Sequence, residues 1–246
     1  MIICEIGLNH MGDQERAIQM IEKILDSDAD AISFQIRESK FYINNPDFLL
    51  PESFYEYAKN IINLGGKLFG LSVCDSSYKD YVSSTSADFY KVLSWAIGDL
   101  KLVNKLTSIN DSFIYLSTGM SNYEELDELM EEYQTIKEKI SLIHTQLSFD
   151  IDDVNLSAMQ KMKSKYSVPI SYGHHCKDMS VLYLSTAFLP DNIFFYVKLN
   201  DSVKNPDDKH AVNLSEIDKV VSRIKTLPRA IGNSNKIKMK NQVESL

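Results

Sequence analysis

The residues that could carry chemistry in this chain gather where short apolar runs end. The run Ile2-Ile3-Cys4 leads to an acid, Glu5, and then to a polar turn that contains Asn9 and His10. Later apolar runs are followed in the same way by Gln35, Ser72, Lys91, Ser94, Ser117, Thr118, His144, His174, His175 and Lys198. Acids, imidazoles, hydroxyls and lysines in one set can transfer protons, bind anions and ligate a metal ion.

Histidines are concentrated in this set. Four of the five lie at or just after a predicted strand end, and the fifth, His210, lies with Asp207 in a turn after the last strand. A single histidine is more often a hydrogen-bonded structural residue than a ligand. The grouping nevertheless favours one shared site.

These residues are positioned by β-rich runs that alternate with helical patterns. Strands are predicted to end near Glu5 and to span 31–36, 67–73, 89–94, 113–118, 140–145, 169–173 and 193–199. Helices are predicted at 14–25, 54–64, 100–107, 122–137, 154–165, 178–187 and 214–225. About eight strand–helix units indicate an α/β fold, a (β/α)₈ TIM barrel, in which chemistry lies at the C-terminal strand ends. A doubly wound open sheet is the alternative, because periodicity does not show whether a sheet closes.

Local signals place two helix starts. Asp13 is a predicted cap for the helix at 14–25. Ser121-x-x-Glu124 is a predicted capping box for the helix at 122–137. We therefore expect one barrel domain over residues 1–226, followed by a polar, lysine-containing tail at 227–246.

Composition limits the function classes. With 246 residues, 44% of them hydrophobic and 24% charged, the chain can bury a large core. The net charge of −8 argues against a nucleic-acid-binding protein. No apolar window approaches the length of a membrane span. Three cysteines without CxxC spacing argue against a disulfide framework or zinc knuckle, and no signal peptide is recognised, so we expect a cytoplasmic protein.

The ordered motifs resemble the sialic acid (N-acetylneuraminate) synthases and related nonulosonic acid synthases. These enzymes condense phosphoenolpyruvate (PEP) with an N-acylated amino sugar in a metal-bearing barrel. The resemblance spans nearly all of residues 1–226 and rests on segments that come in the family's order. They are 5–13 (EIGLNHMGD), 28–31 with Phe34-Gln35, 90–92 with Ser94, 117–120 (STGM), 153–156 (DVNL) and 171–175 (SYGHH).

The resemblance implies roles for individual residues. Glu5 would be an acid/base or substrate-orienting carboxylate, Lys91 would neutralise the PEP phosphate, and His175 would ligate the metal, which makes these three the expected catalytic residues. The expected substrate-binding residues are Asn9, Gln35, Ser94, Ser117, Thr118, His144, Lys198 and Asp207. The implied cofactor is a divalent ion, Mn²⁺, Mg²⁺ or Zn²⁺, with His10 as a second candidate ligand beside His175.

Several positions depart from the family pattern. Ser33 stands where a lysine near PEP is expected, and Leu199 stands where a second metal histidine is expected. Leucine cannot bind a metal. Trp95-Ala96 replaces a Gly-Asp pair, and Gly173 and His174 replace a serine and an aspartate. Full-length family members also have an antifreeze-like C-terminal domain, which is not expected in residues 227–246.

The sequence therefore leaves two alternatives for metal binding. His175 could share an ion with His10, His144 or His210, with oxygen from Glu5 or Asp207. Alternatively, no metal binds and Lys91 or Lys198 polarises the carbonyl, in the extreme case through a Schiff base on Lys198. A further alternative is that Glu5 and Lys91 have no catalytic role and form a structural ion pair with each other.

The leading functional hypothesis is an N-acetylneuraminate synthase-like transferase that makes a nonulosonic or related 3-deoxy-ulosonic acid for surface polysaccharide. The alternatives are a catalytically degenerate binding or scaffold subunit and a barrel aldolase or lyase with another substrate. The expected partners are PEP, an amino sugar and a second copy in a homodimer. A separate protein with an antifreeze-like domain is a further candidate partner, whereas nucleic acid and membrane are not expected.

Overall fold

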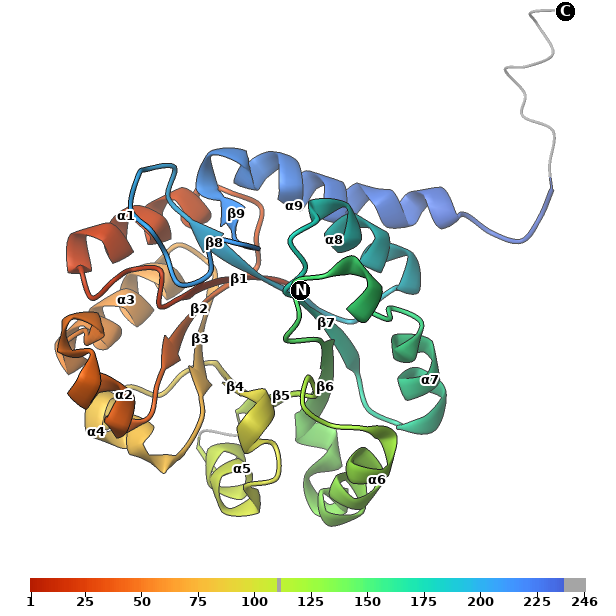
Figure 1. The fold of residues 1–246 in the computed structure, drawn as a ribbon, viewed down its shortest axis with the longest axis horizontal. Helices are drawn as coiled ribbons and strands as arrows, with labels where there is room; N and C mark the ends of the chain where they lie inside the picture. Colours follow the sequence, from red (N-terminus) through yellow and green to blue (C-terminus); the bar gives the residue numbers. More distant parts are fainter. Residues whose placement is uncertain (110–111, 237–246) are drawn as a thin grey trace, which may run out of the picture.

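A closed barrel forms the body of the protein. The computed structural model describes residues 1–109 and 112–236, and within them eight parallel strands pair in chain order, with β8 returning to β1 (Figure 1). The strands are β1 (Ile2–Gly7), β2 (Ala31–Ile36), β3 (Leu68–Val73), β4 (Phe89–Val92), β5 (Phe113–Ser117), β6 (Ile140–Thr145), β7 (Ile170–His174) and β8 (Ile193–Lys198). A short strand, β9 (Val212–Asn213), pairs with the end of β8. The predicted TIM barrel is confirmed, and the open sheet is excluded.

Helices surround the strands (Figure 1). They are α1 (Gln14–Leu25), α2 (Ser39–Asn44), α3 (Glu52–Leu64), α4 (Lys79–Val82), α5 (Leu100–Thr107), α6 (Tyr123–Glu132), α7 (Ala158–Lys165), α8 (Met179–Ser185) and α9 (Ile217–Thr226). The short helices α2 and α4 lie in connections for which the sequence predicted no element. None of the helices in the described part of the chain is long and apolar enough to cross a membrane.

Of the two predicted helix caps, one is confirmed and one is wrong. Asp13 caps α1, since its side chain accepts a hydrogen bond from the Arg16 backbone N–H, as predicted. The predicted Ser121–Glu124 capping box is wrong by one residue. Asn122 accepts from the backbone N–H of Glu125, whose carboxylate accepts from that of Asn122. Asn and Ser are both good caps, so composition alone could not choose between neighbouring positions.

Two layers of side chains fill the barrel. The lower layer is an apolar cluster, separate from the larger core between strands and helices, and consists of Ile3, Ala31, Phe89, Tyr115, Ile143 and Phe194. Side chains two positions apart on a strand point to the same face. The next inward-facing residues are therefore Glu5, Ser33, Lys91, Ser117, Thr145 and Tyr196, all buried. The apolar layer thus serves as the floor of a polar layer at the C-terminal strand ends.

The floor depends on a glycine on β3. A Cβ added to Gly70 would lie 2.1 Å from the ring of Phe89. Because the ring is buried among other large side chains, we expect Gly70→Ala to lower the free energy of unfolding by about 1–3 kcal/mol, as measured by urea denaturation. Gly98→Ala is the control, because nothing lies within 4 Å of the added Cβ. Equal stability of the two variants would contradict the packing described.

Candidate active site

A buried ion pair lies at the centre of the polar layer. Lys91 Nζ donates to Glu5 Oε1 at 2.6 Å, and the two side chains are only 3% and 2% exposed. The ammonium also lies 5.4 Å from the ring centroid of Phe194, in the apolar floor, and 5.7 Å from that of Tyr196. Two residues that the sequence assigned to substrate are thus bound to each other, and Lys91 must leave Glu5 or share it in order to contact an anion.

Hydroxyl groups surround this pair. Ser33 is paired with Glu5 across β1 and β2, and Ser72 is paired with Lys91 across β3 and β4. The Oγ atoms of Ser33, Ser72 and Ser117 are buried and have no hydrogen-bond partner among the described residues. A buried hydroxyl without a partner is unfavourable by about 1–3 kcal/mol. A ligand rich in oxygen that bonded to these groups would recover that energy.

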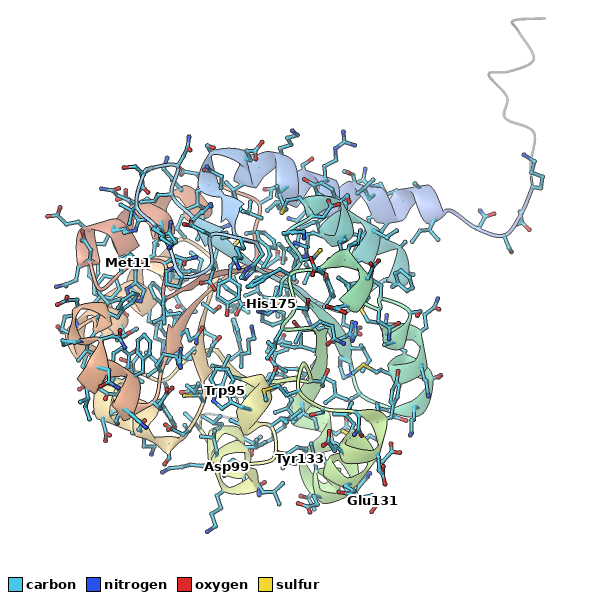
Figure 2. All side chains as sticks on the ribbon, viewed as in Figure 1. Met11, Trp95, Asp99, Glu131, Tyr133 and His175 are labelled. Carbon is cyan, nitrogen blue, oxygen red and sulfur yellow. The ribbon has the colours of Figure 1, made fainter. Side chains whose placement is uncertain are left out.

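A cluster of aromatic and imidazole rings includes His175, which Figure 2 shows inside the ring of strands. The ring centroid of His175 lies 4.9 Å from that of His210 and 5.6 Å from that of Tyr196. His175 Nδ1 is 2.8 Å from Thr145 Oγ1. Burial, followed by the electrostatic effects of His210 and Lys91, lowers the pKa of His175 well below its usual value. Burial, followed by the charges of Lys91 and Lys198, lowers the pKa of His210 to about 4. Both imidazoles are therefore neutral at pH 7.

Asp207 enters the site from the loop that follows β8. Its Oδ1 lies 3.8 Å from His210 Nε2. Burial, and then the charge of Glu5, raise the pKa of Asp207 to about 7. Asn9 holds this loop in place, because its Nδ2 donates to the Val197 carbonyl at 2.8 Å and its Oδ1 accepts from the Asp207 N–H at 3.2 Å. Asn9 is fully buried, so its observed contacts are those of a positioning residue.

Arg16 reinforces the same loop from α1. Its guanidinium donates to the Asn9 carbonyl at 2.8 Å and to Asn205 Oδ1 at 2.8 Å, and it also pairs with Asp201. Arg16 was not among the residues predicted for the site. Its position one turn into an amphipathic helix gave no sign that it would reach across to the β8 loop.

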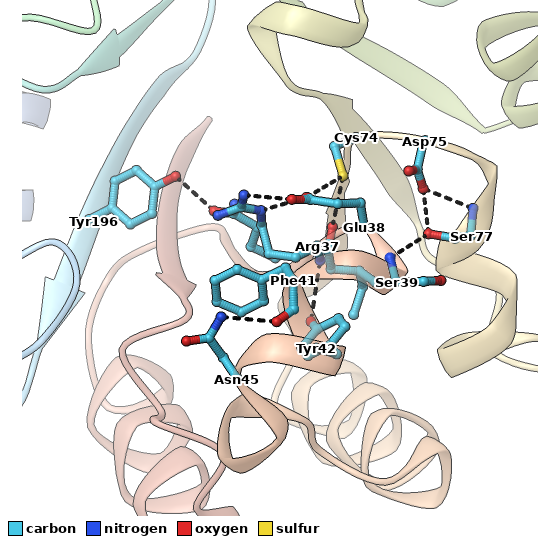
Figure 3. Close-up of polar contacts among 12 residues, drawn as sticks. Arg37, Glu38, Ser39, Phe41, Tyr42, Asn45, Cys74, Asp75, Ser77 and Tyr196 are labelled. Carbon is cyan, nitrogen blue, oxygen red and sulfur yellow. Dashed lines mark hydrogen bonds and ion pairs between the residues drawn. The ribbon is translucent and has the colours of Figure 1, made fainter.

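A second polar group at the barrel mouth comes from β2 and the segment after it (Figure 3). Gln35 Oε1 accepts from Tyr196 Oη at 3.3 Å. Arg37, which was not among the predicted site residues, lies 4.5 Å from the ring centroid of Phe41 and 5.5 Å from that of Trp95. Its Nε and Nη2 donate to Glu38 at 2.9 and 3.0 Å. Ser33, Gln35 and Arg37 are spaced two residues apart, and side chains at this spacing along a strand lie on the same face. This spacing could have indicated Arg37 as a site residue.

Three predicted site residues do not contact the Glu5–Lys91 pair. His144 faces the outer core, where its Nε2 lies 2.9 Å from the Val154 carbonyl and its ring stacks on Tyr172. Thr118 Oγ1 donates to the Ile143 carbonyl at 2.9 Å. Thr118 and His144 both line a side cavity of about 170 Å³. His10 accepts from the Gly12 N–H through Nδ1, at 2.9 Å, and lies against Phe34 in the outer core.

Two other predicted residues lie at the rim. Lys198 Nζ donates to the carbonyl and carboxylate oxygens of Asp208 at 3.0 and 3.1 Å, so it is engaged as an ion pair. Ser94 Oγ accepts from the Gly119 N–H at 3.2 Å, at the end of β4 beside the polar layer. The Lys198 side chain is 24% exposed, whereas Ser94 is buried.

A metal ion would have few protein ligands here. Leu199, at the position of the expected second histidine, is buried in the hydrophobic core. Over residues 1–109 and 112–236, no three His, Cys, Asp or Glu side chains are grouped so that they could hold a metal by themselves. The structure does not bring His10 to His175, whereas it does bring His210 there. Any ion at His175 must take most of its ligands from solvent or substrate.

Comparison with known proteins identifies the lineage of this barrel. The model of the NeuB family matches residues 47–236. The chain belongs to the NeuB family. Members of this family are PEP-dependent synthases and generally use a divalent metal. The family resemblance drawn from the motifs is confirmed, while the substrate of this divergent member is not fixed by membership alone.

Individual NeuB relatives are distant. An uncharacterized protein of Methanocaldococcus jannaschii is 27% identical over 98% of this chain and 74% of its own length. The N,N'-diacetyllegionaminic acid synthase of Campylobacter jejuni is 24% identical over 100% of this chain and 81% of its own length. The crystal structure of N-acetylneuraminic acid synthetase from Leptospira borgpetersenii, with 24% identity, superposes with a TM-score of 0.86 over 99% of this chain and 89% of that one. At this identity the superposition shows the shared fold.

The ion pair predicts a large effect of removing one partner. Glu5→Ala would leave the Lys91 ammonium buried without its counter-ion, so we expect the free energy of unfolding to fall by about 3–5 kcal/mol. The double variant Glu5→Leu/Lys91→Met should recover most of that loss, because no charge remains buried. Urea denaturation of both variants measures the difference. A loss below about 1 kcal/mol in Glu5→Ala would contradict a desolvated pair.

Buried neutral histidines predict acid sensitivity. Burial, with smaller contributions from nearby cationic groups, lowers the pKa of His10 to about 3 and that of His174 to about 4, against 6.5 when unfolded. The unfolded chain then binds more protons, so the stability they contribute is fully present above pH 6.5 and is lost as the pH falls toward these values. Each histidine adds a slope of up to about 1.4 kcal/mol per pH unit.

His174→Gln removes one such group. Its free energy of unfolding, measured by urea denaturation at several pH values between 6.5 and 4.5, should vary with pH less steeply than that of the wild type, by about one histidine's slope. Two parallel curves would show that His174 is not buried in its neutral form.

Proposed function

We propose that this NeuB-family chain is a PEP-dependent synthase that joins PEP to an N-acyl amino sugar or a related aldose. The product would be a nonulosonic or related 3-deoxy-ulosonic acid for surface polysaccharide. The observation that carries the proposal is the Glu5–Lys91 pair, buried among unpartnered hydroxyls at the C-terminal strand ends. A cation, a carboxylate and hydroxyl donors at this end of a barrel suit a substrate with phosphate and carboxylate groups.

Substrate binding would exchange partners within the polar layer. The PEP phosphate would take Lys91 from Glu5, since a dianion attracts the ammonium more strongly than one carboxylate does. Ser117 and Ser94 would donate hydrogen bonds to the phosphate and carboxylate oxygens. Glu5, released from its counter-ion, could then accept or donate a proton at the reacting sugar. Gln35, oriented by Tyr196, would contact the sugar.

The proposed reaction forms one bond between carbons. C3 of PEP attacks the aldehyde carbon of the sugar, whose oxygen takes up a proton to become a hydroxyl. Water adds at C2 of PEP, and inorganic phosphate leaves as C2 becomes a ketone. A divalent ion, Mn²⁺, Mg²⁺ or Zn²⁺, would supply polarisation of the aldehyde, and His175 would be a ligand. Asp207 and Lys198, at the rim, would bind the distal part of the sugar.

Two substitutions favour a second candidate function. Ser33 removes a cation expected near PEP, and Leu199 removes an expected metal ligand. A NeuB-family barrel that had lost catalysis could remain as a binding or scaffold subunit. Arg37 is a cation on the same strand face as Ser33, four residues closer to the mouth, and it favours retained anion binding.

We propose that the protein acts in the cytoplasm as a homodimer, with a separate antifreeze-like protein as the alternative partner.

Phosphate release tests the two candidates against each other. Purified protein with PEP, Mn²⁺ and a panel of N-acyl hexosamines should release inorganic phosphate only when PEP and a suitable sugar are both present. We expect a ketone-bearing acid to appear in equal amount. Binding of PEP without phosphate release for any sugar, alone or with an antifreeze-like partner, would favour the binding subunit.

A variant without the Lys91 charge tests whether this lysine binds PEP. In the double variant Glu5→Gln/Lys91→Gln no buried charge is left unpaired, so the barrel should remain folded, as checked by near-UV circular dichroism. Loss of one charged contact should weaken PEP binding by about 1.5–3 kcal/mol, roughly 10- to 150-fold, in calorimetric titration. Lys101→Gln, at an exposed position of α5, should leave the affinity unchanged. Wild-type affinity in the double variant would contradict the assignment of Lys91 to PEP.

A further inference from the structure

We propose that His175 and His210 together bind a divalent metal ion, so that a histidine from the β8–α9 loop replaces the ligand that Leu199 cannot provide. Two observations carry this inference: the spacing of the two rings, and the lack of a hydrogen-bond partner for either ring nitrogen of His210 among the described residues. The role of such an ion in catalysis rests on the proposed function, whereas its binding does not.

The ring spacing fits a shared ion. An imidazole nitrogen binds Zn²⁺ or a similar ion at about 2.1 Å, which places each ring centroid roughly 3.2 Å from the metal. Two such rings at angles between about 90° and 110° have centroids roughly 4.5–5.3 Å apart. The centroids of His175 and His210 are 4.9 Å apart.

His175 is prepared as a ligand by its neighbour. Its Nδ1 lies 2.8 Å from Thr145 Oγ1, and no hydrogen bond to Nε2 is formed within the described residues. With the Nδ1 proton donated to the hydroxyl, the Nε2 lone pair is free and the ring is held in orientation. A hydrogen bond to the second nitrogen is the usual support of a metal-binding histidine.

His210 lacks any such bond. It is 5% exposed, yet neither ring nitrogen has a hydrogen-bond partner among residues 1–109 and 112–236. The outward-facing histidines each have one nitrogen engaged: His144 Nε2 lies 2.9 Å from the Val154 carbonyl, and His174 Nδ1 lies 3.2 Å from Tyr172 Oη. His174 Nε2 has no partner among the described residues, whereas in His210 both nitrogens lack one. A buried imidazole without a partner is unfavourable, and a metal ion would provide one.

The surrounding charges permit a cation. Lys91 is neutralised by Glu5 at 2.6 Å, and Lys198 by Asp208 at 3.1 Å. Asp207 Oδ1 lies 3.8 Å from His210 Nε2, and Asp207 forms no ion pair with a lysine or arginine of the described residues. Because three protein ligands are not grouped here, water or substrate oxygens would complete the shell. Two imidazoles with oxygen ligands suit Co²⁺, Zn²⁺ or Mn²⁺.

Cobalt provides a direct probe of this site. Full-length protein is stripped with a chelator and titrated with Co²⁺, and both the visible absorption and the bound metal, by elemental analysis, are measured. We expect one equivalent in the wild type. His210→Gln and His175→Gln should each weaken binding at least tenfold, whereas His174→Gln, the sequence neighbour that faces the outer core, should bind as the wild type does. Thermal unfolding of each variant checks that it is folded.

Each outcome decides the question. If the wild type binds no Co²⁺ or Zn²⁺, or if His210→Gln binds as the wild type does, the inference is overturned. If His174→Gln loses binding as strongly as His210→Gln, the effect is one of folding, and the inference also fails. PEP titration of the metal-free protein is measured separately, so failure of the metal site and failure of the proposed function remain distinguishable.

Discussion

The site depends on one constraint, which is the alternation of side chains along the barrel strands. Each apolar residue of the floor is followed two positions later by a polar residue that faces the same interior. On β1 and β4 this step runs from Ile3 to Glu5 and from Phe89 to Lys91. Charges so deeply buried are tolerated because they are paired. The floor excludes water from below, and any ligand must therefore enter from the C-terminal end.

Much of this arrangement follows from sequence. The alternation of strand and helix patterns predicted the barrel, and because parallel strands end at the same edge, the residues at their ends were expected to meet. Glu5 and Lys91 do so, and Ser117 is buried in the same inward-facing layer. The sequence could not show whether Glu5 and Lys91 serve a substrate or each other. In the structure they bind each other, and that contact is compatible with both roles.

Other assignments needed the register and the loops. His144 is adjacent to inward-facing Ile143, so it points outward, but a strand pattern alone does not tell which of two alternating sets faces the interior. His10 lies in a turn, where no periodicity exists. His210 comes from a loop whose path is fixed by contacts with Asn9 and Arg16, distant in sequence. Such contacts leave no local pattern.

The structure presents a NeuB-family site that has been altered yet remains polar. Where Ser33 and Leu199 remove a cation and a ligand, Arg37 and His210 stand nearby with the same kinds of group. Each replacement comes from a segment adjoining the strand that lost the residue, β2 and β8.

The most direct test of the central claim, that the Glu5–Lys91 pair opens to receive PEP, is a crystal structure of the protein soaked with PEP. We predict the phosphate within hydrogen-bond distance of Lys91 Nζ, with Ser117 Oγ as a further donor and Glu5 separated from the ammonium. An intact Glu5–Lys91 pair, with PEP bound elsewhere on the surface or not at all, would contradict the account and leave the pair a structural feature of the barrel.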